Sequence, residues 1–267
     1  MSLPKELKLR EDWLAAMASA RAKIAARAQE RYTREKAEFD EKTAKREATQ
    51  KKTGKKPRGK PPTPPEPGVK DMEQINLTDE ESRIMKVSAG GFEQCYNAQA
   101  AVDAQTMLVV ATGLTQAPND KQQVIPMIKA LQDQVPLLGA VTMLIADTGF
   151  CSESNVNACG QAKMEPLIAL ARQDHHPHWS ERFTEPAPLQ ADATPMQAMA
   201  HRLTTKAGRA AYALRKQTVE PVFGIIKSVM GFRQLSLRGL RKVSGEWNLV
   251  CLAWNIKRMA VLRPKVG

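Results

Sequence analysis

Apolar residues recur at helical spacing along the first fifty residues, yet they form only a thin stripe. Leu7, Leu14, Met17, Ile24 and Ala28 follow one another in a segment rich in Ala, Glu, Lys and Arg. Their intervals match the period of an α-helix, and the narrow stripe leaves little surface for a core. The pattern predicts a charged helical arm over residues 1–50, made of one or two long helices.

A basic and then proline-rich segment follows the arm. Six prolines lie between Pro57 and Pro67, and a proline ring fixes φ and removes a backbone donor, which excludes helix and sheet alike. Residues 51–74 are therefore predicted to form an extended, mobile linker. Its lysines and arginines suit either contact with DNA or simple solvation, and the composition does not choose between them.

From residue 75 the pattern alternates between strand-like and helix-like periods, which predicts an α/β fold over residues 75–267. Short apolar runs predict strands at 97–103 and 107–111, paired through a turn at 103–106 in which Asp103 serves turn chemistry. A nearly continuous apolar segment at 140–146 predicts a buried strand that ends at Asp147. The other predicted elements are helix 120–131, helix 152–158, strand 166–171, a loop at 173–195, helix 196–201, helix 207–230 interrupted by Pro221, and helix 243–262 with Trp247 and Trp254 in the core.

The net charge of +12 is distributed unevenly along the chain. Residues 1–70 hold 19 basic and 10 acidic side chains, residues 71–200 hold 7 and 16, and residues 201–267 hold 14 and 2. An acidic centre suits divalent cations and basic flanks suit phosphates, so the pattern is typical of an enzyme that processes nucleic acid. A charge-skewed fold without such a role fits the composition equally well.

Several other classes of protein are disfavoured. No apolar run approaches the roughly 18 residues of a membrane span, and no secretory signal opens the chain. The four cysteines lack any CxxC pairing, which argues against a disulfide framework or a zinc ribbon. His175, His176 and His178 have no paired cysteines beside them, so a solvated loop is the stronger interpretation there. We expect a soluble, cytoplasmic protein with a polyanion as its partner.

Two acidic residues stand out by their context. Asp147 follows the most convincing strand, at the carboxyl end where open α/β sheets place their sites, although a helix cap or turn is the commoner role of such a residue. Glu220 is one of only two acids in the last 67 residues. It fits either an ordinary ion pair or a metal ligand, with Arg215 and Lys227 gripping phosphate in the second case.

Three stretches, taken in order, carry a family resemblance: GFEQCYNAQAAVDAQTMLVVA, LIADTGFCSE and YALRKQTVEPVFGIIKSVMGFRQLSLRGL. Together they closely resemble the DDE transposases of bacterial insertion sequences, in the subgroup with a Tyr-Arg-Glu-Lys signature. The resemblance runs from about Asn76 to Arg263. It implies an RNase H-like fold, a mixed sheet flanked by helices, and three carboxylates that hold two divalent ions.

The resemblance assigns roles residue by residue. Asp147, in ADTGF, matches the second catalytic carboxylate, and Glu220 matches the third. Tyr212, Arg215 and Lys227 match the remaining positions of the signature and are implied to be catalytic companions. Because Asp147 and Glu220 would share a metal pair, we expect their carboxyl groups about 4 to 8 Å apart.

The first carboxylate has no clear counterpart. The family carries it on the first strand of the sheet, and no such motif precedes residue 76. Asp79 is the only well-placed substitute, on a segment that resembles a loop. Residues 1–70 resemble the charged helical insertion of the family. The chain is therefore expected to correspond to the carboxyl-terminal part of a longer transposase, lacking its first strand.

The implied reaction is phosphoryl transfer at transposon ends, with Mg²⁺ or Mn²⁺ as cofactor and double-stranded DNA as partner. Further expected partners are a second copy of the chain or a full-length transposase, and the expected location is the bacterial nucleoid. The alternative is a catalytically dead, DNA-binding remnant or regulator. An RNase H-like nuclease unrelated to transposition is disfavoured by the signature spacing. We name four residues that flank the glycine-broken loop the basic group and expect them to bind DNA: Arg233, Arg238, Arg241 and Lys242.

Overall fold

The computed structural model describes residues 5–55, 57, 59–87, 90–170, 184–190 and 192–263, which divide into two compact units. The first unit comprises residues 1–80 and the second residues 81–267. The predicted loop at 173–195 lies largely outside the described residues, and its three histidines lie entirely outside them.

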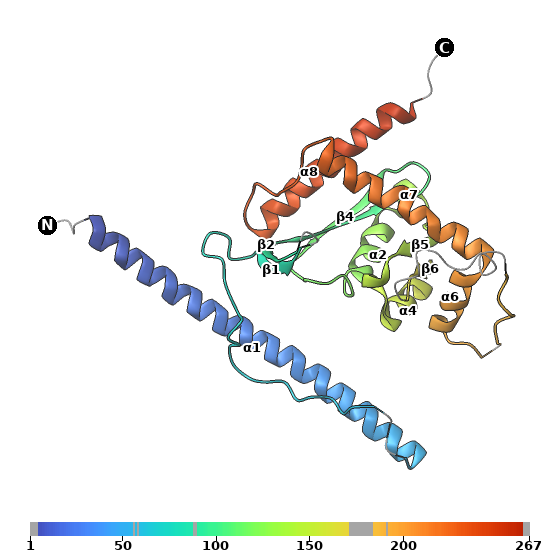
Figure 1. The fold of residues 1–267 in the computed structure, drawn as a ribbon, viewed down its shortest axis with the longest axis horizontal. Coiled ribbons are helices and arrows are strands. Elements are labelled where there is room, and N and C mark those ends of the chain that lie inside the picture. The colour runs from blue at the N-terminus through green and yellow to red at the C-terminus, as the bar shows by residue number, and fades with distance from the viewer. Residues whose placement is uncertain are drawn as a thin grey trace. The chain divides into compact units, whose positions relative to one another are not determined.

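The first unit is built on one long helix, α1 (Lys5–Thr53), which Figure 1 shows in blue. The proline-rich segment that follows runs back along α1. Arg46 donates to the carbonyl oxygens of Pro57, Gly59 and Lys60 at 3.2, 3.0 and 3.3 Å. Nearer the start of the helix, Arg31 donates to the carbonyl oxygen of Gly68 at 2.6 Å. The segment is extended, as the prolines require, and these contacts join it to the helix; its mobility stays a prediction.

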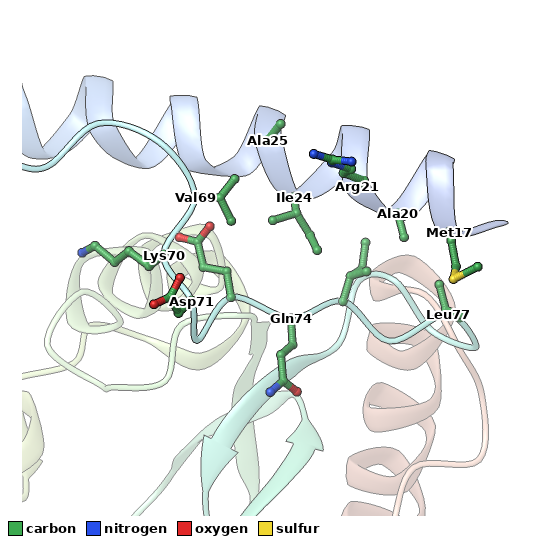
Figure 2. A pocket seen from close by; sticks show the side chains of 12 residues that line it. Met17, Ala20, Arg21, Ile24, Ala25, Val69, Lys70, Asp71, Gln74 and Leu77 are labelled. Carbon is green, nitrogen blue, oxygen red and sulfur yellow. The ribbon is translucent and has the colours of Figure 1, made fainter. Parts of the chain in front are cut away.

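Residues 69–77 lie across α1 and leave an open groove of about 870 Å³. Figure 2 shows Ala20, Ile24 and Val69 among the side chains that line it. Its lining is largely aliphatic, with the charged side chains of Arg21, Lys70, Asp71 and Glu73. None of the candidate catalytic residues lines it.

The second unit contains three two-stranded pairings. Strands β1 (Arg83–Lys86) and β2 (Phe92–Cys95) are antiparallel, and so are β3 (Asn97–Val102) and β4 (Val109–Thr115). Strands β5 (Met143–Ala146) and β6 (Glu165–Ile168) are parallel. The predicted hairpin is confirmed, and the Asp103 carboxylate closes its turn by accepting from the Thr106 amide at 2.8 Å.

Helices surround these strands. They are α2 (Val124–Asp133), α3 (Val135–Leu138), the 3₁₀ turn η1 (Thr148–Phe150), α4 (Glu153–Gln161), α6 (Pro195–Thr204), α7 (Lys206–Ser228) and α8 (Leu240–Leu262). Figure 1 shows β4 between α2 and α8, and both helices contact this strand. Helix α7 contacts β3 and β5, and so links the hairpin to the parallel pair.

The main core lies between the hairpin and the two last helices. Trp247 and Trp254 are each 4% exposed, which confirms their predicted core position. The Trp247 indole donates to the carbonyl oxygen of Gln99 at 3.0 Å, and the Trp254 indole donates to that of Met107 at 2.9 Å. Each ring therefore buries its apolar surface while its one donor is satisfied. Phe223 of α7 stacks on Trp247 with ring centroids 5.6 Å apart.

Three details differ from the sequence-based expectation. Helix α7 runs through Pro221 without interruption. Proline lacks a backbone N–H and so removes one helical hydrogen bond, but the packing of Val222 and Ile226 in the core outweighs this loss. Strands β1 and β2 were not predicted, since they are short and largely exposed. The described strands form small sheets within a mixed α/β fold, and the single RNase H-like sheet stays a prediction.

Candidate functional site

Asp147 lies in the turn between β5 and α4. Its Oδ1 accepts from the Gly149 amide at 2.9 Å, so the side chain caps the 3₁₀ turn η1. This is the ordinary role that the sequence allowed. The other oxygen, Oδ2, faces the Arg215 guanidinium with a contact of 3.9 Å. The carboxylate thus serves the local turn with one oxygen and meets a distant helix with the other.

Arg215 contacts both candidate carboxylates. Its Nη2 lies 3.0 Å from Glu220 Oε1, while its Nη1 lies 3.9 Å from Asp147 Oδ2. Since a guanidinium is small and planar, these contacts limit the separation of the two carboxylate oxygens to at most about 9 Å. The structure therefore brings together two acids that 72 residues separate in the sequence.

The burial of the three groups is unequal. The Arg215 side chain is 22% exposed, whereas Asp147 and Glu220 are 48% and 53% exposed. The Nε atom of Arg215 is buried and has no hydrogen-bond partner among the described residues. The cation is thus held inward while the carboxylates keep oxygens open to solvent and to a ligand.

Tyr212 belongs to the same cluster. Its ring centroid lies 6.0 Å from the Arg215 guanidinium carbon, within range of a cation–π interaction. Burial raises the pKa of Tyr212 above its ordinary value; Arg215 opposes this rise, and Asp147 and Glu220 add to it. The phenol is therefore a neutral hydrogen-bond donor at physiological pH, beside two carboxylates.

Lys227 lies two turns beyond Glu220 on α7 and is exposed. Its ammonium lies 6.0 Å from the centroid of the Phe223 ring. Within the described residues it forms no ion pair with Asp147 or Glu220. Four of the five predicted residues, with Lys227 the exception, therefore meet in one cluster.

A third carboxylate approaches this cluster, and sequence reasoning missed it. A Cβ added at Gly149 would lie 3.1 Å from Asp147 Oδ1 and 3.3 Å from Asp120 Oδ2, so the two carboxylates flank the same small space. The Oδ1 of Asp120 accepts from the side-chain amides of Asn97 and Gln99, each at 2.8 Å. No local signal marked it, because Asp120 lies five residues after the end of β4, in the irregular segment before α2.

A divalent cation does not fit this arrangement as it stands. In the part of the chain that the structure describes, no three His, Cys, Asp or Glu side chains gather closely enough to hold a metal ion. Arg215 already forms ion pairs with Asp147 and Glu220 and so competes with a metal ion for their oxygens. The substitute proposed for the first carboxylate, Asp79, lies on an irregular segment at the end of the first unit.

The basic group lies at the junction of α7 and α8, and all four side chains are exposed. Two glutamates hold its backbone in place. Glu246 accepts from the amides of Ser236 and Leu237 at 2.8 to 3.0 Å, and Glu81 accepts from the Leu240 amide at 2.8 Å. Because these carboxylates bind main-chain donors, the arginine and lysine side chains stay available to an anionic partner.

Comparison with known proteins supports one class. Residues 187–260 match the family model described as a transposase DDE domain. The match includes Tyr212, Arg215, Glu220, Lys227 and the basic group, while Asp147 lies before it. It supports a DDE transposase, a class that acts on DNA and generally depends on divalent metals.

Neither a curated protein nor a solved structure matches the chain. None of the helices in the described ranges is long and apolar enough to cross a membrane.

Proposed function

We propose that the chain acts in DNA transposition, with Asp147 and Glu220 as its catalytic carboxylates and double-stranded transposon ends as its substrate. One observation carries the proposal: Arg215 joins these two acids, and the helix that supplies Arg215 and Glu220 lies within the matched transposase segment. The bacterial nucleoid is the site of action that this substrate implies.

The side chains of the cluster have distinct parts in this proposal. Arg215 forms ion pairs with Asp147 and Glu220 while no phosphate is bound and offsets part of their negative charge. It is itself a suitable ligand for the scissile phosphate, since a guanidinium binds phosphate oxygens as well as carboxylates. Tyr212, neutral and adjacent, donates a hydrogen bond toward a phosphate oxygen. Lys227 and the basic group bind the flanking DNA backbone, which sets affinity without reading sequence.

Mg²⁺ or Mn²⁺ is the cofactor that the reaction class requires. Two carboxylates that are paired with an arginine do not supply enough oxygens for two ions. Among the described residues, no third side chain lies close enough to complete a metal site with them. We therefore assign no step to a metal within this chain. We expect the chain on its own to bind DNA without cutting it, and completion of the metal site requires a further carboxylate.

A second candidate depends on other features of the same unit. A DNA-binding remnant or regulator, which binds transposon ends or a full-length transposase, needs the basic group and not the acids. The absence of a three-ligand group among the described side chains favours it. Both candidates share the DNA partner, so only the chemistry distinguishes them.

The test combines binding and strand cleavage of supercoiled DNA with Mg²⁺ or Mn²⁺. The variants are Asp147→Asn, Glu220→Gln and Asp79→Ala, with Asp133→Asn as a matched control, because Asp133 is exposed at the end of α2. Cleavage lost in the first two variants and kept in the control would establish the catalytic carboxylates. Cleavage also lost in Asp79→Ala would identify Asp79 as the first carboxylate.

Binding without cleavage in the unmodified chain would support the expectation stated above and the second candidate. Failure to bind DNA at low salt would refute both. Cleavage that persists in Asp147→Asn and Glu220→Gln would show that the assigned acids are not the catalytic ones.

A further inference from the structure

Helix α8 has two apolar faces. One is buried against the hairpin and α7, where Val243, Trp247, Cys251 and Trp254 are at most 4% exposed. Asn255 fixes this face to the sheet by bonding the amide and carbonyl of Val109, each at 2.8 Å. The register of α8 on the strands is therefore determined, and with it the direction of the opposite face.

The opposite face carries an apolar stripe in solvent. It consists of Leu249, Leu252, Ile256 and Met259, which are 66, 51, 56 and 48% exposed. Their separations of three, four and three residues are those of a coiled-coil seam, in which such positions interlock with a second helix. A surface helix of a globular protein normally carries polar residues there. Figure 1 shows the last turns of α8, in red, extending past the neighbouring α7.

We propose that this stripe binds the same stripe of a second copy of the chain, with the two α8 helices antiparallel. A stripe of this spacing is complementary to itself, and a twofold axis that passes midway between Leu252 and Ile256 on this face brings Leu252 opposite Ile256 of the second copy. Leu249 then lies opposite Met259. The proposal goes beyond the proposed function and does not depend on it.

Charge selects the antiparallel direction. The stripe continues at helical spacing to Lys242 near the start of α8 and to Arg263 just past its end. A parallel pair would place each of these cations opposite its own counterpart, and like charges at such positions are destabilising. The antiparallel pair places Arg263 opposite Gly245, where a Cβ would meet nothing within 4 Å, and leaves Lys242 beyond the end of the partner helix.

The area of the stripe sets the strength of the dimer. Four half-exposed aliphatic side chains bury roughly 400 Å² per copy, about half of the 800 Å² per partner that is typical of a stable complex. We therefore expect a weak dimer, with a dissociation constant in the micromolar to near-millimolar range.

Sedimentation equilibrium over a hundredfold range of chain concentration tests the interface. The variant Leu252→Gln with Ile256→Gln removes the centre of the stripe and should weaken association at least tenfold. Val261→Gln is the matched control, since Val261 is 67% exposed on the same helix and lies on the side away from the stripe. Circular dichroism and urea unfolding would show that all three chains fold.

Two results would overturn the interface. One is a chain that is monomeric at every concentration, which would mean that the stripe binds a different partner. The other is a double variant that associates as strongly as the unmodified chain.

Disulfide cross-linking tests the relative direction of the two α8 helices. An equimolar mixture of Leu249→Cys and Met259→Cys chains should form a cross-linked dimer, with the unmodified chain as control for its own cysteines. Cross-linking of Met259→Cys chains to themselves would instead show a parallel pair and refute the antiparallel arrangement.

Discussion

Replacing Arg215 by methionine tests the central contact of the candidate site. The substitution keeps an unbranched side chain of similar length while it removes the cation between Asp147 and Glu220. In water, Coulomb's law gives about 1.4 kcal/mol for charges 3.0 Å apart and about 1.1 kcal/mol at 3.9 Å. Both carboxylates are about half exposed, so solvent screening and side-chain entropy reduce these values to about 1 and about 0.5 kcal/mol.

Double-mutant cycles isolate these energies. Urea unfolding of the unmodified chain, Arg215→Met, Glu220→Gln and the double variant should give a coupling of about 1 kcal/mol, and the Asp147→Asn cycle about half as much. Raising the salt concentration to about 1 M should reduce both, because the Debye length then falls to about 3 Å. Lys206→Met is the matched control, since Lys206 is exposed at the start of the same helix, about 20 Å along the helix axis from Glu220, and should show no coupling to it.

The total cost of Arg215→Met is expected to remain near 1 to 2 kcal/mol, below the 3 to 5 kcal/mol typical when a fully buried pair is broken. Within the part of the chain that the structure describes, the buried Nε of Arg215 has no hydrogen-bond partner, and its removal recovers part of the desolvation penalty. Couplings below about 0.2 kcal/mol in both cycles would refute the bridge, because a cation that joins both acids cannot be energetically independent of them.

Three further predictions follow from the second unit. Replacing all four residues of the basic group by alanine should weaken duplex DNA binding and flatten the plot of log affinity against log salt by about 3 to 4 units, measured by fluorescence anisotropy; an unchanged slope would exclude phosphate contact. Gly208→Ala should cost more than about 2 kcal/mol in urea unfolding, because its Cβ would lie 1.9 Å from the Arg202 carbonyl oxygen, whereas Gly224→Ala, with nothing within 4 Å, should be neutral or stabilising. Burial raises the pKa of Cys251 to about 12, so the folded state binds the thiol proton more tightly than the unfolded state does. The contribution of this thiol to the free energy of unfolding is therefore complete below about pH 9 and is lost as pH rises toward 12. Stability between pH 9 and 11 should therefore fall less in Cys251→Ala than in the unmodified chain, and an equal fall would contradict the assignment.

Local patterns in the sequence determined most of the secondary structure. The hairpin at β3 and β4, the strands β5 and β6, and the last three helices follow from periods of two or 3.6 residues, which depend only on neighbours along the chain. The same local reasoning placed Asp147 directly after a strand and Glu220 on a helix. Pro221 shows where such local reasoning fails, because helix propensity alone predicts a break at this residue and the packing of α7 overrides it.

Only the tertiary structure decided which side chains meet. Arg215 reaches Asp147 because α7 packs against β5, and Asp120 approaches the same turn because Asn97 and Gln99 hold it from a different strand. The return of the proline segment along α1 likewise depends on Arg46, whose partners lie more than ten residues away. In α8 the sequence shows an apolar helix but not which side is covered. The contacts of Trp247, Trp254 and Asn255 with the hairpin fix which side is covered. Leu249, Leu252 and Ile256 then point the opposite way, where they are exposed, because residues on opposite faces of a helix cannot contact the same surface.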